Sequence, residues 1–410
     1  MSRLMTRRRY KHALAGALCA ALFLPGCSED ERVTSNEEAV TFNDEVKVGV
    51  IHSQTGTMAV SEDSALSGLI LAIDDINRGG GITIEGKKSR LVPVIGDARS
   101  DAAEHGWVTG SLLDDSEIKV VFGGWTSAGR KMMIPFFRSG NALLFYSIQY
   151  EGGENAPHVF YLGPTPEQQS LPAIDWFLAQ GHRDFFLLGS DYVYPITANK
   201  LFRKHIQAAG GRIRGEEYVP LGDTIRPNLI AKIRASMPSG GVILNTVNGD
   251  SNESLFREMN RYYVNRKNGY FSLSFSIDES SIDQWGPKHF EGAYLSQGFF
   301  EDYSKGTNKS FMRKYKNRYG AEKKLNDAAV TSYVAVHIWA RAVEHASTTD
   351  PQAVEKALIG SSHEGPLGKV QVNEDRHLTR EIFLGRVNPG GTIEVLKSFG
   401  EITPKGTVLQ

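Results

Sequence analysis

Short apolar runs alternate with amphipathic stretches along most of this chain, and this alternation restricts the fold more than any other feature. The run Val46–Ile51 is followed by Ser61–Asn77, where apolar residues recur at helical spacing. Strands that alternate with helices of this length are typical of βαβ units on parallel sheets, so we expect an α/β fold. The pattern predicts further strands at 91–95, 119–122, 142–145, 184–188, 212–219, 241–244 and 270–275, and helices at 101–113, 127–138, 166–179, 194–209, 226–235, 251–263, 309–319, 327–345 and 351–358.

The first residues carry an export pattern. Met1–Lys11 is basic and lacks acids, Ala13–Leu24 is almost wholly apolar, and Leu24-Pro25-Gly26-Cys27 follows. A basic region, a short apolar region and small residues describe a secretory signal, and the run is too short to span a bilayer. The ending also resembles the lipobox of bacterial lipoproteins, which implies a lipid on Cys27. We therefore predict a lipoprotein signal peptide at 1–26 and a flexible tether at 27–45, since Ser28–Glu45 is polar and acidic.

Removal of this signal changes the charge of the protein. Five basic residues leave with it, so 41 Lys and Arg remain against 47 Asp and Glu, a net charge of about −6. No basic stripe remains, which argues against a nucleic-acid partner. Only Cys19 and Cys27 are cysteines, and Cys19 lies in the signal, so we expect no disulfide. The remaining length of about 380 residues exceeds what one core usually serves, so two lobes are expected.

Five predicted strands end in polar and aromatic residues. Ligands of open α/β sheets lie beyond the carboxyl ends of the strands, so these ends should converge on one cleft. The segments are Gly123–Ser127, Tyr146–Glu151, Gly189–Tyr194, Asn245–Asn252 and Ser276–Glu279. Their many Tyr, Trp, Asn, Gln and Ser residues, with few charges, suit a compact polar ligand that carries little net charge.

Individual residues in these segments have alternative interpretations. Trp125 lies in the cleft or in the core, and Ser127 caps a helix while its neighbouring N–H groups could bind a ligand carbonyl. Glu279 either accepts ligand N–H groups or begins a surface helix. Asp191, Asp250 and Glu151 fit structural or turn positions better, and Arg130 and Lys131 are expected along a helix surface.

Four strings carry a family resemblance. FGGWTSAGRK at 122–131, LFYSIQYEG at 144–152, LLGSDYVYP at 187–195 and NGDSN at 248–252 closely resemble the urea-binding lipoproteins of ABC transporters. The similarity extends from Val46 to about Thr403, and more distantly to short-chain amide receptors and branched-chain amino-acid receptors. It implies a type I periplasmic-binding fold, with two doubly wound parallel-sheet lobes joined by a three-strand hinge. We place lobe 1 at 46–164 with 297–365, and lobe 2 at 165–296 with 366–410.

The resemblance also implies a set of ligand-binding residues. Ser127, Tyr146, Tyr150 and Tyr192 match cleft residues of the amide receptors, Gln149 lies in the urea-like form of its motif, and Asn248 and Glu279 fall at matching strand ends. With Trp125 these are the predicted substrate-binding residues. The segment FSIDESSID departs from the acid-rich version expected of urea receptors, so another ligand is open.

The chemistry of urea fits this set. Urea has one carbonyl acceptor and four N–H donors. Ser127 could bind the carbonyl, while Glu279, Asn248, Gln149 and tyrosine oxygens could accept the N–H groups. A site that satisfies every polar group rejects analogues that leave one unpaired, at about 1–3 kcal/mol for each.

We therefore expect an extracytoplasmic receptor that binds urea or a short-chain amide and delivers it to an ABC permease. A receptor for an amino acid or another small polar solute is the alternative, and a sensor for a signalling partner is another. No Gly-x-Ser-x-Gly elbow, His-Glu-x-x-His motif or Walker loop is present, and the histidines lack metal-ligand spacing. We expect no catalysis, no metal and no cofactor. The partners are the ligand, the permease subunits and, through the lipid, the periplasmic or cell-surface face of a bacterial membrane, inner or outer.

Overall fold

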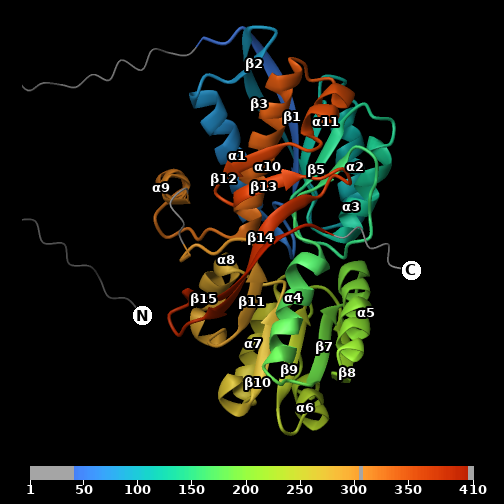
Figure 1. Ribbon diagram of the computed structural model, residues 1–410, viewed down its shortest axis with the longest axis vertical. Helices are drawn as coiled ribbons and strands as arrows, with labels where there is room; N and C mark the ends of the chain where they lie inside the picture. Colours follow the sequence, from blue (N-terminus) through green and yellow to red (C-terminus); the bar gives the residue numbers. More distant parts are fainter. Residues whose placement is uncertain (1–40, 304–307, 405–410) are drawn as a thin grey trace, which may run out of the picture. The chain divides into compact units, whose positions relative to one another are not determined.

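The computed structural model describes residues 41–303 and 308–404. The predicted signal peptide, the lipid-bearing Cys27 and the tether up to residue 40 lie outside the described residues. Two sheets and the helices that pack on them make up the described chain (Figure 1).

The first sheet is built from buried apolar strands. Its strand order is β2-β3-β1-β4-β5-β6, and all neighbouring strands are parallel except β2, which pairs antiparallel with β3. Parallel strands are buried on both faces, which is why β4 and β5 read as unbroken apolar runs. The strands are β1 (Asp44–His52), β2 (Ile82–Ile84), β3 (Lys87–Asp97), β4 (Val120–Gly123), β5 (Leu143–Tyr146) and β6 (Val159–Tyr161).

Helices from both ends of the described chain cover this sheet. In Figure 1, α1 and α10 lie side by side beside it, and α2 packs with α3 elsewhere on the same sheet. The predicted helix 127–138 is shorter than expected. The α-helix ends at Met133 because Pro135 cannot continue its hydrogen bonds, and a 3₁₀ turn follows. The helices are α1 (Ala59–Arg78), α2 (Ala102–Leu113), α3 (Ser127–Met133), η1 (Ile134–Phe137), α9 (Asn308–Tyr319), α10 (Asp327–Ala346) and α11 (Pro351–Leu358).

The second sheet combines a parallel part with an antiparallel tail. β8, β7, β9, β10 and β11 are parallel neighbours, and β14 then pairs antiparallel with β11 and with β15. Its elements are α4 (Pro166–Ala179), β7 (Asp184–Ser190), α5 (Val193–Ala208), β8 (Arg212–Val219), α6 (Pro227–Ser236), β9 (Gly241–Thr246), α7 (Ser251–Arg261), η2 (Arg266–Asn268), β10 (Tyr270–Ser274), α8 (Glu279–Trp285), η3 (Pro287–His289), β11 (Tyr294–Gln297), β12 (Ser362–Gly365), β13 (Gly368–Val372), β14 (Leu378–Val387) and β15 (Ile393–Ile402).

The apolar cores define two lobes. The core around the first sheet takes in α9, α10 and α11, and we call this body the first lobe. The core around β7, β9, β10 and β11 takes in α4 to α8, and we call it the second lobe. The chain passes between them three times, after β6, after β11 and along β14. The predicted α/β fold with two mainly parallel sheets and three crossings is thus confirmed, while the predicted limits of each lobe stay a prediction.

One arginine joins all three crossings. Arg380 of β14 is completely buried and donates through Nη1 to the carbonyl of Leu162 in the first crossing, at 3.2 Å. Its Nη2 lies against Gly298 in the second crossing, where an added Cβ would come within 2.1 Å. Asp327 of α10 supplies the balancing carboxylate. The three crossing segments therefore share one buried charge pair.

Candidate functional site

A pocket lies where the two lobes meet, at the strand ends that the sequence singled out. Both lobes and the second crossing line it, and three of its residues (Trp125, Gln149 and Asn248) belong to the predicted site. None of the described residues that line the pocket is Lys, Arg or His. The lining residues are Met58, Ser61, Trp125, Gln149, Asn248, Gly249, Phe275, Ser276, Ile277, Asp278, Gln297, Asp327 and Ala328.

Three side-chain amides line this pocket, and the nitrogen of each donates one N–H group to a backbone carbonyl. Gln149 donates across the lobes to Phe275 O at 2.7 Å, and Asn248 donates to Thr246 O at 2.9 Å. Gln297 donates to Ile277 O at 2.9 Å. A carbonyl can only accept, so each amide must turn its nitrogen to that carbonyl and its oxygen away from it. The amides therefore offer acceptor oxygens.

Two carboxylates stand at the edge of the same pocket. Asp278 caps α8 and also accepts a hydrogen bond from Asn326 Nδ2, at 2.7 Å, while Asp327 pairs with Arg380. Burial raises the pKa of Asp278 despite these hydrogen bonds, and it raises the pKa of Asp327 against the opposing charge of Arg380. The polar part of the pocket is therefore rich in acceptors.

A sealed ion cluster lies behind the cleft in the first lobe. Arg130 is completely buried, so the expectation that it runs along a helix surface is wrong. Its Nε and Nη2 donate to Glu154 at 3.0 and 2.8 Å, Nη2 also reaches Glu151 at 3.2 Å, and Nη1 donates to Ser127 Oγ at 3.0 Å. Lys131, which is 43% exposed, adds a second cation beside both carboxylates.

The charges of this cluster stabilise one another. Burial alone would raise the pKa of Glu154, but the hydrogen bond and charge of Arg130, helped by Lys131, lower it to about 2. Glu151, interpreted as structural from the sequence, is a member of the cluster. Every guanidinium nitrogen of Arg130 has a partner, and four of its five N–H groups are used within the cluster, so only one N–H of Nη1 is left without a partner there.

Several predicted ligand residues are members of this cluster or its aromatic walls. The Arg130 guanidinium lies 4.8 Å from the ring centre of Tyr146 and 4.5 Å from that of Tyr150. Tyr146 donates its hydroxyl to Trp125 O, and Ser127 donates to Glu151. The expectation that Ser127 caps the helix is wrong, because Thr126 is the N-cap of α3 and accepts from Gly129 N. The structure thus brings Ser127, Tyr146 and Tyr150 together, with their hydroxyls already paired.

Tyr150 also connects the cluster to the third crossing. His377 Nδ1 donates to the carbonyl of Asp375 at 2.9 Å, so its Nε2 accepts, and the Tyr150 hydroxyl donates to Nε2 at 2.5 Å. Tyr161 stacks against both Tyr150 and His377, with ring centres 5.0 and 4.8 Å away. Burial raises the pKa of the Tyr150 phenol, which keeps it a donor.

Tyr192 and Glu279 lie outside the pocket lining. Tyr192 directly precedes α5 in the second lobe, and burial raises the pKa of its phenol, with contributions from Tyr194, Tyr146 and Glu151. Glu279 lines a neighbouring pocket with Glu301, and its Oε1 accepts from Glu301 N at 2.9 Å. Burial raises the pKa of Glu279 well above its usual value. The ligand roles predicted for both residues stay predictions.

A loop of the first lobe touches the second lobe at two glycines. Loop 53–58 is held by Ser100, whose hydroxyl donates to Thr55 O at 2.8 Å and accepts from Met58 N at 3.0 Å. A Cβ added at Gly222 would lie 2.9 Å from Thr57 Cγ2, and one at Gly249 would lie 3.1 Å from Thr57 O. Both glycines have positive φ, at 84° and 65°. The lobes are in close contact at this edge of the cleft.

Comparison with known proteins identifies the family. The periplasmic binding protein domain matches residues 46–406, which is most of the chain. The chain belongs to this family.

Named relatives of this periplasmic binding protein are distant. A protein of Brucella abortus called Leu/Ile/Val-binding protein homolog 6 is 22% identical over 364 residues, which cover 87% of this chain and 90% of that protein. A limonene hydroxylase of Geobacillus stearothermophilus is 24% identical over 119 residues, so this match covers only 29% of this chain and 22% of that protein.

Solved structures show the same fold. A solute-binding protein of an ABC transporter from R. palustris, in complex with 4-hydroxybenzoate, has a TM-score of 0.79, with 19% identity over 90% of this chain and all of the other. A leucine-binding protein of Thermotoga maritima has a TM-score of 0.75, with 17% identity over 87% of this chain and 99% of the other. The expected type I periplasmic-binding architecture is therefore confirmed.

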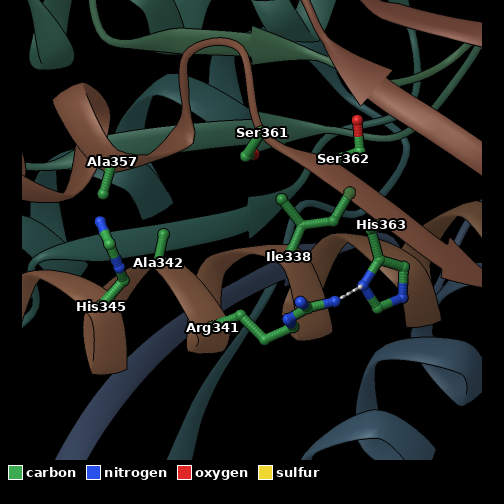
Figure 2. A pocket seen from close by; sticks show the side chains of 8 residues that line it. All are labelled: Ile338, Arg341, Ala342, His345, Ala357, Ser361, Ser362 and His363. Carbon is green, nitrogen blue, oxygen red and sulfur yellow. Dashed lines mark hydrogen bonds between the residues drawn. The ribbon is translucent and has the colours of Figure 1, made fainter.

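A wider pocket of the binding protein lies on the first lobe, between α10, α11 and β12 (Figure 2). Its volume is about 230 Å³, against about 20 Å³ for the pocket between the lobes. Arg341 donates to His363 Nδ1 at 3.2 Å, and burial together with the Arg341 charge lowers the pKa of His363 to about 4. None of the residues predicted from the sequence lines this pocket.

Three polar lining residues, Ser61, Gln297 and Asp327, were not predicted from the sequence, and Ser276 and Asp278 were predicted only as members of the segment Ser276–Glu279. Asp278 and Ser276 stand in the segment FSIDESSID, and the spacing of Asp278 and Ser281 could have identified a helix start. Gln297 carried no local signal, because its position depends on the second crossing.

Within residues 41–303 and 308–404, no helix is both long and apolar enough to cross a membrane. In the same ranges, no three acidic, histidine or cysteine side chains gather closely enough to hold a metal ion.

Proposed function

We propose that this protein is the extracytoplasmic solute receptor of an ABC transporter, and that it binds urea or a short-chain amide between its two lobes. Membership of the periplasmic binding protein family and the ABC-transporter role named for the R. palustris structure support the receptor assignment. Its permease partners follow from that assignment.

The observation that carries the ligand assignment is the orientation of the three cleft amides. Gln149, Asn248 and Gln297 each donate one N–H group to a backbone carbonyl, which fixes the orientation of the amide and leaves its oxygen as an acceptor for a guest. A guest rich in N–H donors satisfies such oxygens, whereas a carboxylate would leave them facing another acceptor. Urea and short amides meet this requirement without a net charge.

Charge and space support the same ligand class. The described residues of the pocket lining include two carboxylates and no cation, and the charge of Arg130 behind the pocket is balanced by Glu151 and Glu154. An anionic guest would therefore meet acceptors and negative charge. The pocket encloses about 20 Å³, little more than one water molecule requires, which favours the smallest guests.

A receptor for a branched-chain amino acid is the second candidate, because the Brucella relative is named as a Leu/Ile/Val-binding protein homolog. The ammonium group of an amino acid would suit the acceptor oxygens, but its carboxylate would need donors. The two candidates therefore differ in whether a carboxylate is required for binding.

Calorimetry of the purified protein separates them. Urea, acetamide, formamide, leucine and 4-hydroxybenzoate are titrated in parallel at pH 7. Saturable binding of urea or an amide supports the proposal. Tight binding of leucine or of the aromatic acid, with silent amides, overturns the ligand assignment and leaves the receptor role intact.

Lipid anchoring is part of the same proposal. The basic and apolar N-terminal regions and the Leu24–Cys27 ending support cleavage before Cys27 and acylation of that residue. Several acyl chains would hold the protein at a membrane surface, since each buried CH₂ contributes about 0.8 kcal/mol. Mass spectrometry of the native protein should find a lipid-modified Cys27, and an intact Met1 would refute the anchor.

A further inference from the structure

Gln297 occupies a special place in the cleft, at the end of β11 where the second crossing begins. Its side chain is only 6% exposed. The nitrogen Nε2 donates to Ile277 O, while the oxygen Oε1 has no hydrogen-bond partner among the described residues. Buried polar atoms are usually paired, and Gln297 belongs to the lining of the pocket, so its unpaired oxygen is available to a donor that a ligand supplies.

The orientation of this amide is fixed by its partner. Ile277 O can only accept a hydrogen bond, so a flipped Gln297 amide would set two oxygens against each other. Oε1 therefore remains an acceptor whatever ligand enters. An N–H group can bind it, whereas a ligand carbonyl or carboxylate oxygen at the same place would be repelled.

The backbone that carries Gln297 is also held in place. The next residue, Gly298, packs so closely on Arg380 that a Cβ would lie 2.1 Å from Nη2. Arg380 is held in turn by Leu162 O at 3.2 Å and by Thr331 Oγ1 at 3.1 Å. The acceptor is thus positioned by both other crossings before any ligand arrives, which lowers the entropic cost of using it.

We infer that Gln297 is a specificity-determining residue, which selects ligands that place an N–H group at the crossing end of the cleft. This inference rests on the proposed function, since it names one residue that reads the N–H groups of the guest. It also gives a reason for rejecting acetone, which has nearly the shape of urea and no N–H group.

The first test uses two matched glutamines. Gln169 is equally buried, at 3% exposure, and donates to Ser296 O at 2.8 Å, but it does not line the cleft. Gln297→Met should weaken urea binding tenfold or more, whereas Gln169→Met should lower the unfolding temperature and change the urea affinity less than twofold. A Gln297→Met protein that binds urea as the wild type does would overturn the inference.

A second variant separates recognition from packing. Gln297→Glu places a carboxylate where the amide stood, so the ratio of guanidinium affinity to urea affinity should rise at least tenfold over the wild type. An equal loss of affinity for both probes would mean that Gln297 only fills space, and the inference would fail.

The same titrations distinguish this inference from the proposed function. If the wild type binds leucine and no amide, the amide assignment fails, and Gln297→Met is then judged on leucine, whose ammonium also carries N–H groups. A tenfold loss there supports the role of Gln297, and an unchanged affinity refutes it. A wild type that binds only 4-hydroxybenzoate, or none of the probes that carry N–H groups, refutes both the proposed function and this inference.

Discussion

Two polar regions of this protein lie close together and differ in how completely their groups are paired. In the cluster around Arg130, every guanidinium nitrogen donates to Ser127, Glu151 or Glu154. In the pocket between the lobes, the oxygen of Gln297 has no partner among the described residues. Gln149 and Asn248 each donate one N–H group to a backbone carbonyl. Buried polar groups that are paired within the protein stabilise the fold, whereas buried groups with unused hydrogen-bonding capacity can bind a ligand. From this difference we propose a structural role for the first region and a role in recognition for the second.

The largest expected effect comes from breaking the sealed cluster. Arg130→Met leaves Glu151 and Glu154 buried with only Lys131 nearby, and removing one partner of a buried ion pair costs about 3–5 kcal/mol. Thermal unfolding is the measurement, because urea as a denaturant would also be the proposed ligand. The control is Arg203→Met, which breaks a half-exposed pair with Glu216 and should cost less than about 1 kcal/mol. Equal losses in both variants would contradict a special role for the cluster.

Acid should weaken the same cluster. The pKa of Glu154 is lowered to about 2 from an ordinary 4.5, so its stabilisation is complete above pH 4.5 and is lost as the pH falls from 4.5 to 2. Glu154→Gln should cost roughly 3 kcal/mol at pH 7, given 1.36 kcal/mol for each pKa unit, and the difference should vanish near pH 2. Unfolding temperatures across pH 2–7 give the two profiles, and parallel profiles would refute the linkage.

In the pocket between the lobes, Gln149→Met should reduce the affinity for urea more than it reduces the stability of the fold. The variant removes an acceptor from the cleft and the bond to Phe275, and an unsatisfied ligand N–H costs about 1–3 kcal/mol, a loss of roughly ten- to a hundredfold. Gln352→Met is the control, because Gln352 makes the same kind of bond to Gly140 O, at 3.0 Å, away from the cleft. Equal urea affinities of the two variants in calorimetry would refute the role of Gln149 in ligand binding.

A smaller effect should come from the contact between the lobes. Gly222→Ala places a Cβ 2.9 Å from Thr57 Cγ2, so ligand affinity should fall severalfold through poorer closure, with rescue by Thr57→Ser. Gly181→Ala controls for backbone strain, since Gly181 has a φ of 91° and no heavy atom within 4 Å of the added Cβ. A matching loss in the Gly181 variant would show that strain alone is responsible.

Glu279→Gln should have the smallest effect on binding. Glu279 lies outside the cleft lining, and its raised pKa means that the folded protein holds a proton that the unfolded chain releases above about pH 4.5. The glutamine variant should therefore be slightly more stable at pH 7, with less advantage in acid, and bind urea within twofold of the wild type. A tenfold loss of affinity would support the ligand role predicted from the sequence.

The sequence predicted those features that depend on local patterns. The apolar run Val46–Ile51 became β1, and the helical spacing after it became α1, because period and burial are properties of neighbouring residues. The convergence of strand ends placed Trp125, Gln149 and Asn248 at one pocket, since parallel strands end on the same edge.

Pairing between distant residues could not be predicted in this way. Arg130 has the neighbours of a surface helix residue, and its burial depends on Glu151 and Glu154, more than twenty positions later. Gln297 lies at a strand end without any motif, and its importance comes from Ile277 O and from the crossing beside it. Such positions are determined by tertiary contacts, which a single sequence does not display.

The contacts of Arg380 restrict how the two lobes can move relative to each other. The Arg380 guanidinium binds Leu162 O, packs on Gly298 and pairs with Asp327, so a sliding motion of the lobes that separated these groups would break a buried charge pair. A rotation of the lobes that preserved these contacts would therefore need a change of backbone conformation next to Arg380. The pairing of β14 with β15 is irregular at two places, between Ile382 and Phe383 and between Leu384 and Gly385. We therefore expect such a change on the side of the second lobe.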